Sequence, residues 1–301
     1  MKIDQILRSI VSVRAAIPDD AFTAPVLGTL REGSGVVIRE NGLVLTIGYL
    51  ITEAEEVWLT TSEGRVLPGH ALAYDQETGF GLVQALGRLG LPALEFGDAA
   101  RAMPGDAVIV ADGAGQFVEA RIVAKQEFAG YWEYLLEEGI FTAPAHPSWG
   151  GAALTNAQGE LLGIGSLRLE MAERDGPTDV NMAVPISLLP PILDDLLTRG
   201  AATRLPRPWL GVFSAEDDGK VVVVSVADGG PAAQAGLRKG DVIADVGAEE
   251  VNGLADFYRK LWDCGAAGTE IPLRIVRKGR DAWLRLKSAD RSSFLKKPQL
   301  Q

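Results

Sequence analysis

The sequence predicts a mainly β protein with two domains. Short apolar segments recur along the first part of the chain, each bounded by Gly, Pro, Asn or Asp, which is typical of an all-β barrel or sandwich. The chain has 301 residues, of which 35 are glycines and 47% are hydrophobic. This length suits about two domains, and this composition fits a well-packed, turn-rich globular protein.

The strands of the first domain are bounded by clear turn signals. Asn41-Gly42 is a strong hairpin signal between two apolar segments. Near the end of the domain, residues 188–199 predict a helix whose regular part begins near Pro190-Pro191. Strands are expected at 36–39, 43–46, 57–61, 66–67, 107–111, 151–155, 160–167 and 181–186.

The second domain follows a proline-bearing linker. The block Gly230–Ile243 predicts a short helix that starts at Pro231, then a glycine turn and a strand. Residues 254–261 predict a helix with one apolar face. A final hairpin is expected from 271–276 and 283–286.

The segment Pro147–Gly151 resembles the nucleophile loop of trypsin-like serine proteases of the HtrA type. That family has Gly-Asn-Ser-Gly-Gly here, so its nucleophilic serine falls on Trp149. An indole has no oxygen and cannot attack a carbonyl. The family's oxyanion hole uses the N–H of the nucleophile and that of the residue two before it, which is Pro147 and has no N–H. Loss of one such donor costs about a hundred- to a thousand-fold in rate.

The other two triad positions are also changed. Residues 43–50 resemble the family's histidine motif and place Tyr49 at the histidine. Residues 75–83 resemble its aspartate motif, which keeps Asp75 but places Gly79 at the catalytic aspartate. Since three separately anchored motifs agree, we predict a protease fold without the triad. Two bulky side chains, Tyr49 and Trp149, are expected to fill the old active cleft.

Two neighbouring residues offer an alternative nucleophile and base. Ser148 lies beside the nucleophile position, and His146 lies two residues earlier. No carboxylate nearby in sequence orients this histidine, so we favour a loop serine in a turn and a surface histidine. The other histidine, His70, lies in a predicted strand and is expected to be structural or exposed.

The segment Pro208–Val212 resembles the carboxylate-binding loop of an HtrA-type PDZ domain, and Gly230–Ile243 matches that family's internal block. The resemblance covers about residues 30–290. It implies a trypsin-like double β-barrel, with six strands in each barrel and a division near residues 89–103, followed by a PDZ domain. The expected boundaries are 1–198 for the protease-homology domain, 199–207 for the linker, 208–290 for the PDZ domain and 291–301 for a tail.

The PDZ resemblance implies a site for peptide C-termini. Such a site adds the peptide to a sheet edge and holds its carboxylate with backbone N–H groups. The apolar face of the predicted helix either borders the pocket for the last peptide side chain or fills the core. An aromatic stretch at 128–134 is a candidate partner surface, although we favour a loop that packs on the barrel. The residues expected to bind peptide are Leu210, Gly211, Val212, Phe213, Leu254 and Phe257.

Composition limits partners and location. The formal net charge of −11 and the pI of about 4.8 argue against binding to nucleic acid or anionic membranes. One cysteine, Cys264, and two separated histidines predict neither an internal disulfide nor a zinc site, and no cofactor is expected. Residues 1–13 lack the features of a signal peptide, which suggests a cytoplasmic protein, or a periplasmic one if a leader has been removed.

The expected function is therefore that of an HtrA-like pseudoprotease, an adaptor or regulator that binds protein or peptide C-termini. Two alternatives stay open. One is a weakly active serine endopeptidase that uses Ser148, and the other is a chaperone-like binder of unfolded chains. The resemblance also implies a homotrimer formed through the barrel domain.

Overall fold

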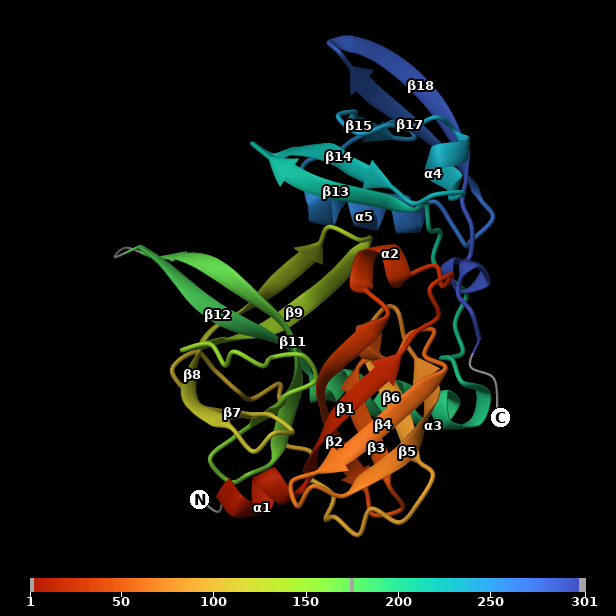
Figure 1. The fold of residues 1–301 in the computed structure, drawn as a ribbon. Helices are drawn as coiled ribbons and strands as arrows, with labels where there is room; N and C mark the ends of the chain where they lie inside the picture. The colour runs from red at the N-terminus through yellow and green to blue at the C-terminus, as the bar shows by residue number, and fades with distance from the viewer. Residues whose placement is uncertain (1–2, 174–175, 298–301) are drawn as a thin grey trace. The chain divides into compact units, whose positions relative to one another are not determined.

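A computed structural model describes residues 3–173 and 176–297 and confirms the mainly β fold (Figure 1). The chain forms two compact units. The first unit contains residues up to 126, residues 137–203 and the chain end from 295. The second contains residues 204–294 together with 127–136, which the sequence assigned to the first domain. The end of the expected tail, residues 298–301, lies outside the described residues.

The first barrel is closed and has the strand order β1-β2-β3-β6-β5-β4. Its β2–β3 hairpin turns at Asn41-Gly42 as the sequence predicts, with Gly42 in the left-handed region at φ +86. Leu43, Leu45 and Leu82 are among the side chains that fill it. Its strands are β1 (Ile10–Ala16), β2 (Leu30–Arg39), β3 (Leu43–Ile47), β4 (Glu56–Thr61), β5 (Val66–Tyr74) and β6 (Phe80–Ala85).

The second barrel repeats this arrangement with the order β10-β11-β12-β9-β8-β7. The segment that joins the barrels contains no strand between β6 and β7, in agreement with the expected division at 89–103. Figure 1 shows the two barrels side by side. The strands are β7 (Ala107–Ala111), β8 (Phe117–Gly130), β9 (Tyr134–Ala143), β10 (Ala153–Thr155), β11 (Leu161–Glu173) and β12 (Gly176–Pro185).

Short helices complete the first unit. The helix predicted near the end of the first domain begins at Pro190 and ends at Arg199, and Gly200 after it takes the left-handed conformation that commonly closes helices. No described helix is long and apolar enough to cross a membrane. The helices are α1 (Ile3–Arg8), α2 (Ala24–Leu27), η1 (Gly48–Leu50), η2 (Ile186–Leu188) and α3 (Pro190–Arg199).

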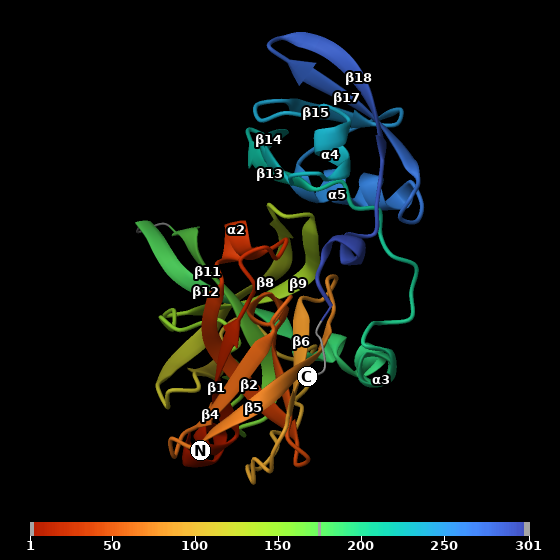
Figure 2. The same ribbon diagram turned by 45° about the vertical axis from the view of Figure 1, so that its right-hand side comes forward.

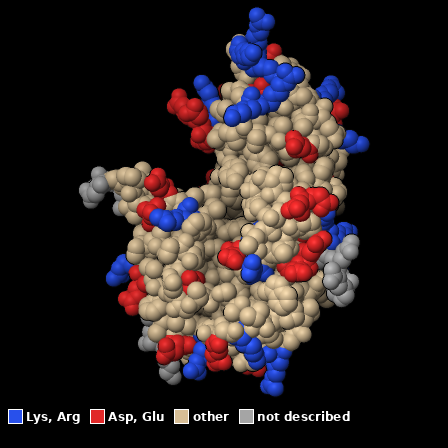
Figure 3. Space-filling model, viewed as in Figure 1, with Lys and Arg blue, Asp and Glu red and all other residues tan. Residues whose placement is uncertain are grey.

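The second unit has a sheet of order β13-β14-β15-β17-β18, with β16 paired to β15. Helix α5 lies against β13 and β14 (Figure 2), and β13 is an edge strand. Lys and Arg gather over β17 and β18 (Figure 3), but Arg274, Arg277 and Arg285 form ion pairs with carboxylates. The elements are β13 (Val212–Asp217), β14 (Lys220–Val226), α4 (Pro231–Gln234), β15 (Val242–Val246), β16 (Glu249–Glu250), α5 (Leu254–Asp263), β17 (Glu270–Arg277), β18 (Arg280–Lys287) and η3 (Arg291–Phe294).

Candidate functional site

The loop that carries Trp149 keeps a tightly defined backbone. Gly150 O accepts a hydrogen bond from Ser34 N at 2.8 Å, and Gly151 N donates to Gly165 O at 2.8 Å. Gly151 has φ +75, and a Cβ there would lie 1.9 Å from Ser34 O. Only glycine fits such a position. The loop is therefore held between the two barrels, while its central side chain has no nucleophilic atom.

Tyr49 lies against this loop and acts as a structural donor. It belongs to η1, and its hydroxyl donates to the carbonyl of Ser166 in β11 at 2.9 Å. Burial raises the pKa of Tyr49, and a hydrogen bond to Trp149 opposes that shift. Arg31 also holds η1 by donating to Tyr49 O at 2.7 Å. A phenol held protonated in this way joins the two barrels and cannot serve as a base near neutral pH.

Gly79 lies at the position where the sequence motif predicts the triad aspartate. Its φ is +82, and its carbonyl accepts a hydrogen bond from Gly48 N at 2.7 Å. The retained Asp75 accepts hydrogen bonds from Thr78 N at 2.9 Å and Thr78 Oγ1 at 2.7 Å. The structure thus brings the Gly79 turn beside η1, but Asp75 is used to close a turn and Gly79 carries no side chain.

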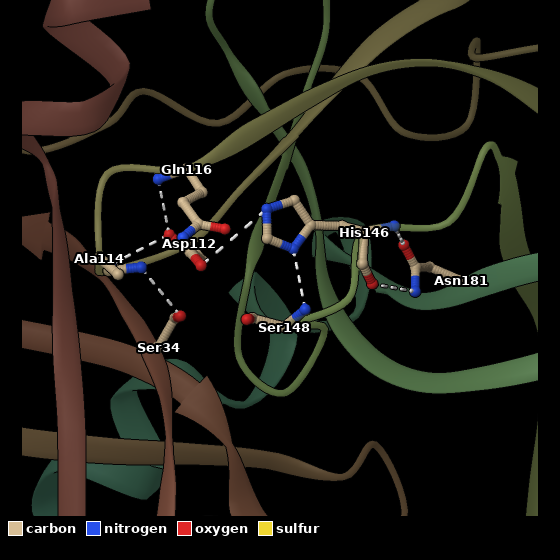
Figure 4. A network of polar contacts seen from close by, with 8 residues as sticks. Ser34, Asp112, Ala114, Gln116, His146, Ser148 and Asn181 are labelled. Carbon is tan, nitrogen blue, oxygen red and sulfur yellow. Dashed lines mark hydrogen bonds and ion pairs between the residues drawn. The ribbon is translucent and has the colours of Figure 1, made fainter.

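His146 is buried, with 1% of its surface exposed, so the expectation of a surface histidine was wrong. Its Nδ1 accepts a hydrogen bond from Ser148 N at 3.0 Å, and its Nε2 lies 4.0 Å from Asp112 Oδ2 (Figure 4). Asn181 holds the backbone of His146, accepting from its N at 2.6 Å and donating to its O at 3.1 Å. Asp112 is far away in sequence, which is why sequence reasoning missed it.

This network resembles a catalytic dyad in composition but differs in geometry. The part of Ser148 that bonds to the imidazole is its backbone N–H, which takes the Nδ1 lone pair that a base would need. Asp112 also accepts hydrogen bonds from the backbone N–H groups of Ala114 at 3.0 Å and Gln116 at 2.8 Å. Pro147 adds no donor for an oxyanion. The arrangement orders a loop and does not activate the Ser148 hydroxyl. The other histidine, His70, lies in β5 as expected.

The loop at residues 209–212 has a different character, because its backbone N–H groups converge on one carboxylate. Leu210 N and Val212 N donate to the side chain of Glu133 at 3.0 and 2.8 Å, and Gly211 N also bonds to it. Gly211 has φ +75, and a Cβ there would lie 2.9 Å from the Trp209 ring. Such a run of N–H groups is an anion-binding nest. Sequence reasoning missed Glu133, because nothing local marks it as the partner of this loop.

The other expected peptide-binding residues surround this loop. Phe213 is half-buried on the edge strand β13, beside Val212. Leu254 and Phe257 lie on α5 and are buried in the apolar cluster of the second unit. Their burial fits both roles left open by the sequence, core and pocket wall.

The aromatic stretch packs within the second unit, which corrects the expectation that it is a loop of the barrel domain. Residues 127–136 form the tip of the β8–β9 hairpin and belong to the second unit. Trp132 and Tyr134 stack with ring centroids 5.5 Å apart, and Tyr131 lies 6.1 Å from the ring of Phe213. Leu135 joins the buried apolar cluster of this unit.

Both parts of the chain match known protein families. Residues 33–164 match a trypsin-like peptidase domain, and residues 208–287 match a PDZ domain. Over 256 residues the chain is 26% identical to a putative serine protease, HhoB, of Synechocystis, with 76% of this chain and 59% of that protein covered. Over 265 residues it is 26% identical to the periplasmic serine endoprotease DegQ of Escherichia coli, with 82% and 57% covered. The chain thus spans somewhat more than half the length of these relatives.

Solved structures show the same fold. The HtrA-type protease AlgW with a decapeptide matches with a TM-score of 0.55 and 21% identity, covering 99% of this chain and 100% of that one. A serine endoprotease from Yersinia pestis matches with a TM-score of 0.54 and 23% identity, covering 96% and 98%. Together with the sequence matches, these structures show a fold of trypsin-like barrels followed by a PDZ domain, similar to that of HtrA-type proteases.

Proposed function

We propose that this chain is a non-proteolytic HtrA-like protein that binds the C-terminal ends of proteins or peptides through its PDZ domain. The observation that carries this proposal is the nest formed by Leu210, Gly211 and Val212, whose N–H groups already hold a carboxylate. A peptide α-carboxylate presents the same two oxygens to such donors. The edge strand β13 offers a place for strand addition beside the nest.

The loss of proteolysis rests on the groups found at the catalytic positions. Trp149 lacks a nucleophilic oxygen, Tyr49 is a buried hydrogen-bond donor, and Gly79 has no side chain. Removing the nucleophile of a triad costs roughly a million-fold in turnover. The alternative enzyme, which uses Ser148, would need His146 to give up its hydrogen bond to Ser148 N. We therefore favour binding over catalysis.

Incubation with denatured casein and a fluorophosphonate probe tests the absence of proteolysis. We expect neither cleavage nor labelling, for the wild type and for Trp149→Ser, because the serine alone would lack a base. Ser148→Ala is the matched control for the alternative in which Ser148 is the nucleophile. Labelling that this substitution abolishes would establish Ser148 as a nucleophile and overturn the non-proteolytic proposal.

Location and assembly are narrower proposals. Several relatives are named as periplasmic, which does not support the cytoplasmic location expected from the sequence. We propose that this chain acts in the same compartment as they do. A homotrimer formed through the barrel domain stays a prediction, which light scattering of the purified protein would test.

A further inference from the structure

The carboxylate in the PDZ nest belongs to the chain itself. Glu133 lies at the tip of the β8–β9 hairpin, has only 5% of its surface exposed, and bonds to Leu210 N and Val212 N. An incoming peptide carboxylate would need these same N–H groups, because a backbone N–H donates one good hydrogen bond at a time. Glu133 and a peptide C-terminus therefore compete for one site.

The backbone of the hairpin tip also lies where a bound peptide would pair. Tyr131 O accepts a hydrogen bond from Ser214 N in β13 at 2.9 Å, and β13 is an edge strand of its sheet. This is the hydrogen bond that strand addition would use. The tip thus occupies part of the sheet edge as well as the nest.

Helix α5 also holds the tip. The hydroxyl of Tyr258 donates to Gly130 O at 2.7 Å and accepts from Glu133 N at 3.2 Å. Leu135 lies in the buried cluster that also contains Leu254 and Phe257. An ion pair between Glu127 and Arg259 adds an exposed contact. Polar and apolar contacts therefore act together on one short segment.

The conformation of Glu133 indicates that the tip is shaped for this contact. Its φ is +56, which places a residue with a Cβ in the left-handed region. Such a conformation is uncommon outside glycine and persists where the surroundings fix it. Here the surroundings are the nest, which binds the side chain, and Tyr258, which binds the backbone.

We propose that the hairpin tip, residues 127–136, is a built-in competitor that occupies the PDZ peptide site with the Glu133 carboxylate in place of a peptide C-terminus. This proposal rests on the proposed peptide-binding function. A ligand with a free α-carboxylate and an apolar last residue binds only when the tip leaves the site. Binding is then regulated by how firmly the tip is held.

Fluorescence anisotropy of the full chain tests this competition. The probe is a fluorescein-labelled octapeptide library that ends in Leu, Val or Phe with a free carboxylate, and the same library with C-terminal amides controls for carboxylate recognition. We expect Glu133→Gln to bind the acid library at least tenfold more tightly than the wild type. Tyr258→Phe, which leaves the nest intact, should also raise the affinity. Glu119→Gln, an exposed neutralisation on β8, should bind like the wild type.

The outcomes separate the competition from the binding function. Equal, carboxylate-dependent affinities for wild type, Glu133→Gln and Tyr258→Phe would overturn the competitor but leave peptide binding in place. No carboxylate-dependent binding by any folded variant would overturn the peptide-binding function, and the competitor role with it. The amide ¹H–¹⁵N signals of Leu210 and Val212 give an independent readout. If they do not shift in Glu133→Gln, the carboxylate does not occupy the nest.

Discussion

The proposed triad positions and the PDZ nest differ in which part of the chain carries the chemistry. At the proposed triad positions the nucleophile and base of the resembled family are side chains, and this chain has Trp149 and Tyr49 there. At the nest the working groups are the backbone N–H groups of residues 210–212. A side chain can be lost by one substitution, whereas a backbone N–H is lost only to proline. In the first region Pro147 has no backbone N–H, whereas each of residues 210–212 in the second region has one.

Both regions keep the glycines that shape them. Gly151 still fits against Ser34 O, and Gly211 still fits against the ring of Trp209. In the first region the loop geometry also serves the fold, because the same backbone connects the two barrels. In the second region, the backbone N–H groups that the loop conformation orients are themselves the groups that bind the carboxylate. Binding through the backbone N–H groups of residues 210–212 therefore depends on the loop conformation rather than on the identity of any one side chain.

The largest expected effect comes from distorting the nest with Gly211→Ala, measured in the Glu133→Gln background. Alanine at φ +75 costs about 1–2 kcal/mol, and its Cβ would press on the Trp209 ring. We expect the affinity for the acid octapeptide library to fall about tenfold or more. Gly219→Ala is the matched control, because Gly219 has φ +72 in open space. Unchanged binding by a folded Gly211→Ala protein would show that this loop is not the carboxylate site.

An intermediate effect is expected from pH, because burial raises the pKa of Glu133 to about 7. The N–H groups of residues 210–212 and the charge of Arg291 act in the opposite direction. A released Glu133 would titrate near its ordinary value of 4.5. The docked tip therefore binds a proton more readily, and docking strengthens as pH falls through 7 and levels off near 4.5.

Probe affinity should consequently be about tenfold weaker at pH 5.5 than at pH 8. The probe carboxylate, with a pKa of about 3.5, stays charged over this range. Burial raises the pKa of Tyr258, so its hydroxyl stays protonated over this range. Both histidines belong to the first unit and not to the unit that contains the nest. Anisotropy titrations of the wild type and Glu133→Gln measure the effect. An equally steep pH dependence in Glu133→Gln would assign the titration to another group.

The sequence was sufficient to predict the fold but only part of the candidate site. The hairpin at Asn41-Gly42, the start of α3 at Pro190 and the two barrels are encoded by local turn chemistry and strand patterns. The contacts of Asp112 with His146 and of Glu133 with the nest join residues far apart in the chain. No local pattern specifies such pairs, because they depend on where the barrels and the hairpin tip bring each side chain.

The smallest expected effect concerns what Tyr49 does at the proposed histidine position. Its hydroxyl donates to Ser166 O, so Tyr49→Phe would remove one hydrogen bond between the barrels and leave that carbonyl without this donor. We expect the free energy of unfolding to fall by about 1 kcal/mol, with peptide binding unchanged. Urea unfolding of the full chain measures this loss, and Tyr131→Phe, at an exposed tyrosine, is the control. Equal stability of the two variants would mean that the phenol only fills space, and that nothing structural has replaced the base in the first region.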